Sequence, residues 1–210
     1  DTITTGAGKD NIFYDTIADS SGNTKDTITD FTQSILNATT GAQITAGDSI
    51  KIKINSALAD GQLTNFVLSD KGDVANAGEA VNAMNNSKGS FVFAKDNDVL
   101  YIDMDGDSTL NSDDYAFALT GLDSFHGADL DIEVYGDDNT ATTITTLDGD
   151  DTITTGSAAD IITSGGGADI ISAAAGNNVI TSGAGNDTIT TTSGNDTITA
   201  GAGDDIINAG

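Results

Sequence analysis

The chain has 210 residues, a formal net charge of −26 at pH 7 and no cysteine, proline or tryptophan. Its excess of acidic side chains argues against nucleic acid and anionic membranes as partners and favours cations. The absence of cysteine excludes thiol chemistry and a disulfide framework, and no stretch has the length and hydropathy of a transmembrane span.

The first residues already contain a nine-residue unit. Thr5–Phe13 reads TGAGKDNIF, with Asp10 in its sixth position and Ile12 in its eighth, and residues 1–4 read as the tail of a preceding unit. Fixed-period units of this kind are typical of stacked β architectures. We therefore expect residues 1–14 to be the end of an upstream β-roll.

Residues 15–137 lack the repeat and predict a mixed α/β capping module. Alternating apolar residues predict strands at 26–31, 47–55 and 127–135, and a hairpin at 90–94 and 99–103. Residues 115–122 fit a short helix or a strand. A helix is expected over 73–89, with Asp73 as its N-cap, Gly89 at its end and apolar residues at helical spacing, namely Val74, Ala77, Val81 and Met84.

Residues 103–114 read DMDGDSTLNSDD, which is close to the EF-hand calcium loop. The expected ligands are the carboxylates of Asp103, Asp105, Asp107 and Asp114, together with the backbone carbonyl of Thr109. Ser108 stands where the pattern has glycine, and the alternative is a solvated, Asp-rich turn.

From residue 138 to residue 210 the nine-residue period returns without a break. An isoleucine stands in the eighth position of every unit from residue 146 on, and an Asp or Asn stands in the sixth. A short strand would point the isoleucine inward, and two units would form one coil. The sixth position then lies where a turn meets a strand and can reach a cation between stacked turns. Calcium suits carboxylate and carbonyl oxygens. A β-solenoid with metal-free Asp-Gly turns is the alternative.

Two of these units, SGAGNDTIT at 182–190 and SGGGADIIS at 164–172, closely resemble the RTX repeat GGxGxDxUx. The resemblance implies a parallel β-roll with calcium in both rows of turns and about five bridged sites. Leu147, Ala158, Ala174 and Thr192 depart from the pattern at glycine positions, and Asn178 replaces Asp, which predicts weak or empty sites there. The residues implied in metal binding are Asp151, Asp160, Gly165, Gly167, Asp169, Asn178, Gly183, Gly185, Asp187, Asp196, Gly201, Gly203 and Asp205.

The segments GKDNIFYD, DTITDF and GDSIKI, which follow one another between residues 8 and 52, resemble the region that closes the β-roll of serralysin-type proteases. That resemblance implies that Asp26 completes the last calcium site of the upstream roll, which also contains Asp10. A plain β-meander is the alternative. RTX resemblance also implies type I secretion.

No catalytic motif points to an enzyme: HExxH is absent, and the single histidine, His126, has no partner motif. We expect a calcium-stabilised, extracellular structural protein of a surface layer (S-layer), sheath, filament or adhesin. The alternative is a folding and secretion module of a larger type I-secreted enzyme or toxin. A column of threonines also keeps an ice-binding solenoid as a minor alternative, namely Thr154, Thr163, Thr181, Thr190 and Thr199.

The expected partners are other copies of the chain and, further, a cell-surface polysaccharide. Because the sequence begins and ends inside a nine-residue unit, we expect head-to-tail self-association through unpaired strand edges. The alternative is that the sequence is one piece of a longer tandem chain, in which the same continuation is covalent.

Overall fold

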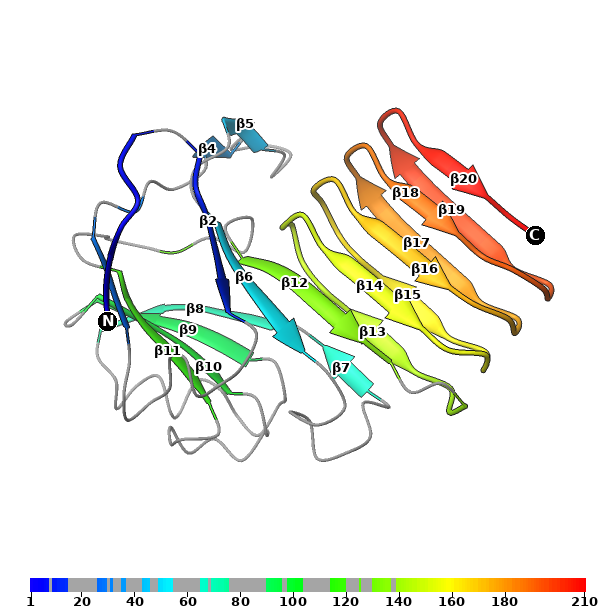
Figure 1. The fold of residues 1–210 in the computed structure, drawn as a ribbon, viewed down its shortest axis with the longest axis horizontal. Coiled ribbons are helices and arrows are strands. Elements are labelled where there is room, and N and C mark those ends of the chain that lie inside the picture. Colours follow the sequence, from blue (N-terminus) through cyan, green and yellow to red (C-terminus); the bar gives the residue numbers. More distant parts are fainter. Residues whose placement is uncertain are drawn as a thin grey trace.

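The computed structural model describes residues 1–7, 9–14, 26–29, 31, 35–36, 43–45, 49–54, 65–67, 69–75, 90–95, 98–103, 114–119, 125, 130–136 and 139–210. Every regular element within these ranges is a β-strand, and the strands pair mostly in parallel (Figure 1). The predicted parallel β-roll is therefore confirmed. In the same ranges, no helix has the length and hydropathy that a membrane crossing requires.

The C-terminal roll consists of two parallel sheets whose strands alternate along the chain. Each strand pairs with the strand two repeat units later, as Ile153 does with Ile171 and Ile162 with Ile180. Two of the repeat units therefore form one coil. One sheet contains β14 (Thr152–Thr155), β16 (Ile170–Ala173), β18 (Thr188–Thr190) and β20 (Ile206–Asn208); the other contains β13 (Thr143–Thr145), β15 (Ile161–Thr163), β17 (Val179–Ala184) and β19 (Thr197–Ala202).

The eighth-position isoleucines form the core between the two sheets. Six of them, from Ile144 to Ile189, are buried. Burying such a side chain contributes about 1.5–3 kcal/mol, so each coil adds two contributions of this size. Ile207 in β20 is 47% exposed, and among the described strands β20 pairs only with β18. The period of nine therefore produces a core that grows coil by coil.

Both roll sheets continue into strands from the preceding part of the chain. The first sheet runs β2 (Asn11–Tyr14), β6 (Ser49–Ile54), β12 (Leu130–Tyr135) and then β14, all in parallel. The second begins with β7 (Asn65–Val67), which pairs with β13. The roll thus shares its sheets with residues of the segment 15–137, and the strands predicted at 47–55 and 127–135 are confirmed. The mixed α/β character predicted for this segment is not seen, because all its regular elements among the described residues are strands.

The repeat-unit isoleucines on the two sides of strand β12 align with positions of this strand that are four residues apart. On one side Leu130 pairs with Ile50, which itself pairs with Ile12 of the first nine-residue unit. On the other side Val134 pairs with Ile153 of the roll. Because β12 spans Leu130–Tyr135, it is long enough to serve both partners. As a consequence, the first turn of the roll meets the beginning of β12.

A further, six-stranded sheet contains the first strand of the chain. Its order is β1 (Thr2–Thr4), β3 (Asp26–Thr29), β11 (Tyr115–Leu119), β10 (Val99–Asp103), β9 (Ser90–Ala94) and β8 (Ser69–Val74). Strands β9 and β10 form the predicted hairpin, with Val99 opposite Ala94. The apolar stretch at 115–122 begins as strand β11. A small pair, β4 (Ile35–Leu36) and β5 (Gln43–Thr45), is antiparallel.

The expectation of a helix beginning at Asp73 is wrong for the residues that the structure describes. Asp73 and Val74 belong to β8 and pair in parallel with Phe93 and Ala94 of β9. The N–H of Lys95 donates to the carbonyl of Val74 at 3.0 Å, which holds this backbone extended. The apolar side chain of Val74 packs against a hydrophobic cluster of the sheet. Packing within a sheet, and not on a helix, therefore explains the apolar residue at this position. Residues 76–89 lie outside the described residues.

Candidate metal sites

The turns of the roll form two rows, one on each side of the stack. The Asp151 edge consists of turns 146–151, 164–169, 182–187 and 200–205, which lead into β14, β16, β18 and β20. The Asn178 edge consists of turns 155–160, 173–178 and 191–196, which lead into β15, β17 and β19. Successive turns of one edge are stacked because they are separated by one full coil.

The sixth-position side chains join successive coils in a ladder. On the Asp151 edge, Oδ1 of Asp169 accepts the N–H of Asp151 at 2.9 Å, and Oδ1 of Asp187 accepts the N–H of Asp169 at 3.0 Å. On the Asn178 edge, Oδ1 of Asn178 accepts the N–H of Asp160 at 3.0 Å. Each of these bonds satisfies a backbone N–H group that the hydrogen bonds between strands do not use. The position therefore requires an acceptor, which both Asp and Asn provide.

The second carboxylate oxygen is the feature that points to a cation. Oδ2 of Asp151, Asp169 and Asp187 is buried and has no hydrogen-bond partner within the described residues, and each of these residues is 1% exposed. Leaving a buried charged acceptor unsatisfied costs more than a hydrogen bond contributes. In this part of the chain no three His, Cys, Asp or Glu side chains converge, so a bound cation would need backbone carbonyls as additional ligands. Calcium accepts such mixed oxygen ligands.

The raised pKa values of the carboxylates on this edge favour the binding of a cation there. Burial raises the pKa of Asp169 to about 7, against an ordinary value of 3.8. Burial, and next the charge of Asp169, raise the pKa of Asp151 well above its usual range. Both shifts show that the fold disfavours the ionised carboxylates in the absence of a cation. A bound divalent ion would reverse this preference.

Glycine pairs allow the turns of the Asp151 edge to stack closely. Gly165, Gly183 and Gly201 in the second position have positive φ, as do the glycines two residues later. A Cβ on Gly183 would overlap the carbonyl oxygen of Gly165 in the turn before. Only glycine combines this backbone conformation with such an approach. The glycine positions that sequence reasoning assigned to the metal sites therefore bring carbonyl groups together along one edge.

The comparison with known families agrees with this geometry. The RTX calcium-binding nonapeptide repeat, in four copies, matches residues 145–180 and 181–210. These residues are RTX repeats. No curated protein and no solved structure matches the chain. The match makes calcium the expected cation of the buried oxygens, and it covers the RTX roll while leaving residues 1–144 unmatched.

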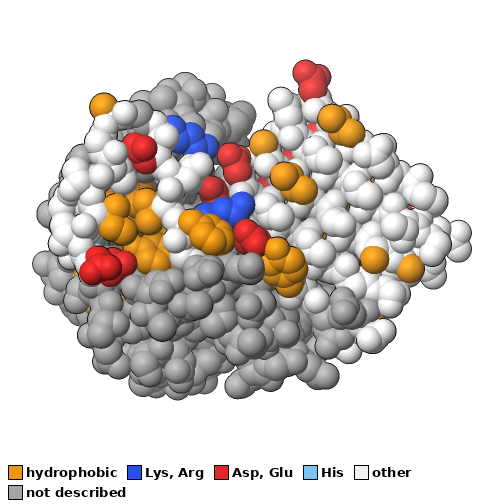
Figure 2. Space-filling view, in the orientation of Figure 1, with side chains coloured by type: hydrophobic (Ala, Val, Ile, Leu, Met, Phe, Trp, Pro, Cys, Tyr) orange, Lys and Arg blue, Asp and Glu red, His pale blue; other side chains and the backbone are white. Residues whose placement is uncertain are grey.

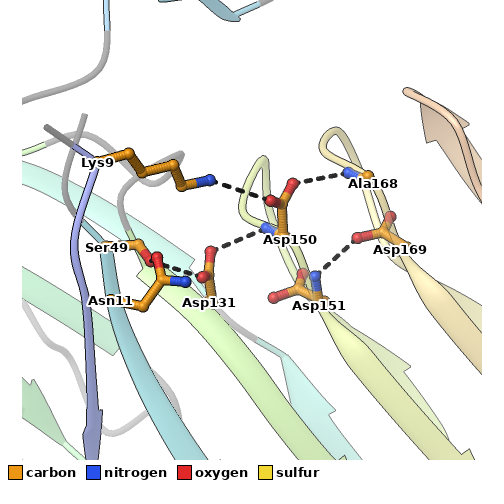
Figure 3. Close-up of polar contacts among 8 residues, drawn as sticks. All are labelled: Lys9, Asn11, Ser49, Asp131, Asp150, Asp151, Ala168 and Asp169. Atoms are coloured by element: carbon orange, nitrogen blue, oxygen red, sulfur yellow. Dashed lines mark hydrogen bonds and ion pairs between the residues drawn. The ribbon is translucent and has the colours of Figure 1, made fainter. Parts of the chain in front are cut away.

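The RTX roll begins at a polar junction that sequence reasoning missed (Figure 3). The N–H of Asp150 donates to Oδ1 of Asp131 at 2.9 Å, and the Ser49 hydroxyl donates to Oδ2 of Asp131 at 2.7 Å. Lys9 Nζ lies 3.3 Å from Oδ2 of Asp150. Burial raises the pKa of Asp131. Protein donors therefore satisfy both Asp131 oxygens, although the residues involved are up to 141 positions apart.

The other predicted metal residues lie before the RTX roll. The register of β10 and β11, with Ile102 opposite Tyr115, brings Asp103 and Asp114 to neighbouring strand ends, and both are buried. The antiparallel pairing of β10 with β11 thus brings the first and last residues of the EF-hand-like loop close together. Asp105, Asp107 and Thr109 lie outside the described residues, so calcium binding by this loop stays a prediction.

Of the two predicted ligands of the upstream roll, Asp26 differs from the RTX aspartates. Oδ2 of Asp26 accepts the Tyr14 hydroxyl at 3.0 Å, and Oδ1 accepts the nitrogen of Asp1 at 2.7 Å. Both oxygens of this buried carboxylate therefore have partners. The carbonyl of Asp10 accepts the N–H of Ser49 at 2.8 Å. A calcium role for either residue stays a prediction.

Proposed function

We propose that this protein is a calcium-stabilised extracellular structural protein, of the kind that builds a surface layer, sheath, filament or adhesin. The observation that carries the proposal is the row of buried aspartates that each keep one oxygen without a partner. Because a cation would offset their mutual repulsion and desolvation, the free energy of calcium binding becomes free energy of folding. Extracellular calcium modules typically bind with Kd values of about 10⁻⁴–10⁻³ M. The roll would therefore fold after export.

The uncharged faces of the roll support a structural role. Every outward strand position from residue 143 to residue 208 is uncharged, although the chain carries a net charge of −26. Four of these side chains are apolar and exposed, namely Ile161, Ile170, Val179 and Ile206. Figure 2 shows the roll surface as mostly uncharged, with apolar groups scattered over it. Flat, neutral faces allow neighbouring molecules to pack without bringing their acidic edges into contact.

The test compares the purified chain in excess chelator and in millimolar calcium, with magnesium as the control. At pH 8, where the buried carboxylates would be ionised, far-ultraviolet circular dichroism should show a coil in chelator and in magnesium, and β structure in calcium. Light scattering in calcium should show particles larger than the 21.2 kDa chain. An unchanged β signal in chelator would refute the role of calcium in folding. A folded protein that stays monomeric at high concentration would instead favour the secretion-module alternative.

A further inference from the structure

The two edges of the roll present different atoms to the gaps between their turns. On the Asp151 edge, the atoms without partners are carboxylate oxygens of Asp151, Asp169 and Asp187. On the Asn178 edge, Oδ2 of Asp160 is also without a partner, but the next turn presents an amide in place of a carboxylate. Oδ1 of Asn178 accepts the N–H of Asp160, which leaves the buried Nδ2 without a partner. Rotating the amide would set its NH₂ group against that N–H donor, so the orientation is determined. An amide nitrogen is a donor and cannot ligate a cation.

The backbone of the two edges differs as well. In three of the four turns of the Asp151 edge, the second position is a glycine with positive φ; the first turn has Leu147 there. None of the second-position residues of the Asn178 edge, which are Gly156, Ala174 and Thr192, has positive φ. Positive φ on that edge is confined to the fourth position, at Gly176 and Gly194. The carbonyl groups of the second edge therefore repeat only part of the arrangement that stacks along the first.

Charge is distributed in the same unequal way. Within residues 139–210, seven of the nine acidic side chains lie in turns of the Asp151 edge: Asp148, Asp150, Asp151, Asp169, Asp187, Asp204 and Asp205. Only Asp160 and Asp196 lie on the Asn178 edge. Asp160 keeps one unpartnered oxygen, but the next turn of its edge offers Asn178 in place of a second carboxylate. The need for cations is therefore concentrated on one side of the roll.

We infer that calcium occupies the Asp151 edge alone, and that the Asn178 amide keeps the opposite edge free of metal. This inference rests on the proposed calcium binding. Four stacked turns on the Asp151 edge leave three gaps, whereas the turns 155–160, 173–178 and 191–196 of the Asn178 edge leave two, and Asn178 borders both. A further gap, on the other side of Asp160, is bordered by Thr142, which donates its N–H to Oδ1 of Asp160 and offers no carboxylate. The roll then binds fewer ions than the approximately five that the repeat pattern predicts. One side of the solenoid depends on calcium, and the other is joined by hydrogen bonds within the protein.

The experiment counts bound calcium in the full chain by native mass spectrometry and by calorimetry. It compares the wild type with three isosteric variants, D187N, D196N and N178D. Asp187 and Asp196 occupy the same position in neighbouring units, on opposite edges. Comparing counts between variants removes the contribution of ions bound elsewhere in the chain.

D187N is expected to lose one or two ions, D196N to keep the wild-type number, and N178D to gain at least one. A loss of calcium in D196N, or an unchanged number in N178D, would overturn the inference while leaving calcium binding intact. If D187N does not fold, the other two variants still decide. A wild type that takes up no calcium would refute the proposed function itself.

Discussion

The backbone N–H of Asp151 donates to Oδ1 of Asp169, which lies one coil further along the chain, at 2.9 Å. Oδ2 of the same Asp169 has no partner within the described residues. One oxygen thus joins two coils, and the other is available to a cation between stacked turns. A single side chain couples strand stacking to metal binding.

Replacing Asp169 by alanine removes the acceptor of a buried backbone N–H. We expect the free energy of unfolding in calcium to fall by at least about 1–3 kcal/mol, since an unsatisfied buried donor costs this much before any loss of metal. Urea denaturation followed by circular dichroism measures the change. Asp148→Ala is the control, because it removes an exposed charge from the same edge, and it should change stability by less than about 0.5 kcal/mol. Equal effects of the two substitutions would contradict the ladder.

Gly183→Ala should disrupt the roll more than a substitution that only strains the backbone. At Gly183 the added Cβ would overlap the Gly165 carbonyl, and φ is +104°. Gly72 also has positive φ, +79°, but nothing lies within 4 Å of the added methyl group, so Gly72→Ala tests strain alone. We expect a loss of about 1–2 kcal/mol for Gly72→Ala and a larger loss for Gly183→Ala. Thermal unfolding in calcium compares them, and similar losses would show that the turns do not stack closely.

At the start of the roll, Ser49→Ala should cost more than Lys9→Met. The Ser49 hydroxyl donates to a buried carboxylate, and such bonds contribute about 1.5–3 kcal/mol. The pair of Lys9 and Asp150 is partly exposed, at 37% and 42%, and is worth about 0–1 kcal/mol. Lys95→Met serves as the control, because Lys95 forms a similar 3.3 Å pair with Asp73 away from the roll. Urea midpoints rank the three variants, and a larger effect of Lys9→Met would contradict this order.

In chelator, the roll should be more stable in mild acid than at neutral or alkaline pH. The pKa of Asp169 is raised to about 7 in the fold, so the folded state binds protons more tightly than the unfolded state. This stabilisation is complete below the ordinary carboxyl pKa of 3.8 and is lost as the pH rises through about 7. Circular dichroism of the chelated protein from pH 4 to pH 8 measures it. Asp169→Asn should weaken the dependence, and stability that increases with pH would contradict the prediction.

Calcium binding should release protons for the same reason. Near pH 6, part of the Asp169 population in the folded, metal-free protein is protonated, and a bound cation favours the carboxylate. Calorimetric titrations in buffers with different ionisation enthalpies measure the number of protons released. An identical apparent enthalpy in all buffers at pH 6 would show that no proton leaves on binding.

The nine-residue period by itself determined the roll, its inward isoleucines and its turn aspartates. A strand pair separated by one coil needs only local repetition, so the position of Ile153 in the sequence already implies its partner Ile171. The same reasoning could list the departures at Ala174, Thr192 and Asn178. It could not show that the amide nitrogen of Asn178 is buried without a partner on that edge, because this depends on which side-chain atom the neighbouring coil uses.

Only the tertiary structure decided how the roll begins. Strands β2, β6 and β12 lie far apart in the sequence and pair at separations that no period predicts. The change of register at β12 places Asp131 beside Asp150, and Lys9 reaches the same turn from the first nine-residue unit. Asp73 and Val74 belong to a strand because they pair with residues of the neighbouring strand β9. Long-range backbone pairing overrides local periodicity here, because a paired strand satisfies its own N–H and C=O groups and those of its neighbour.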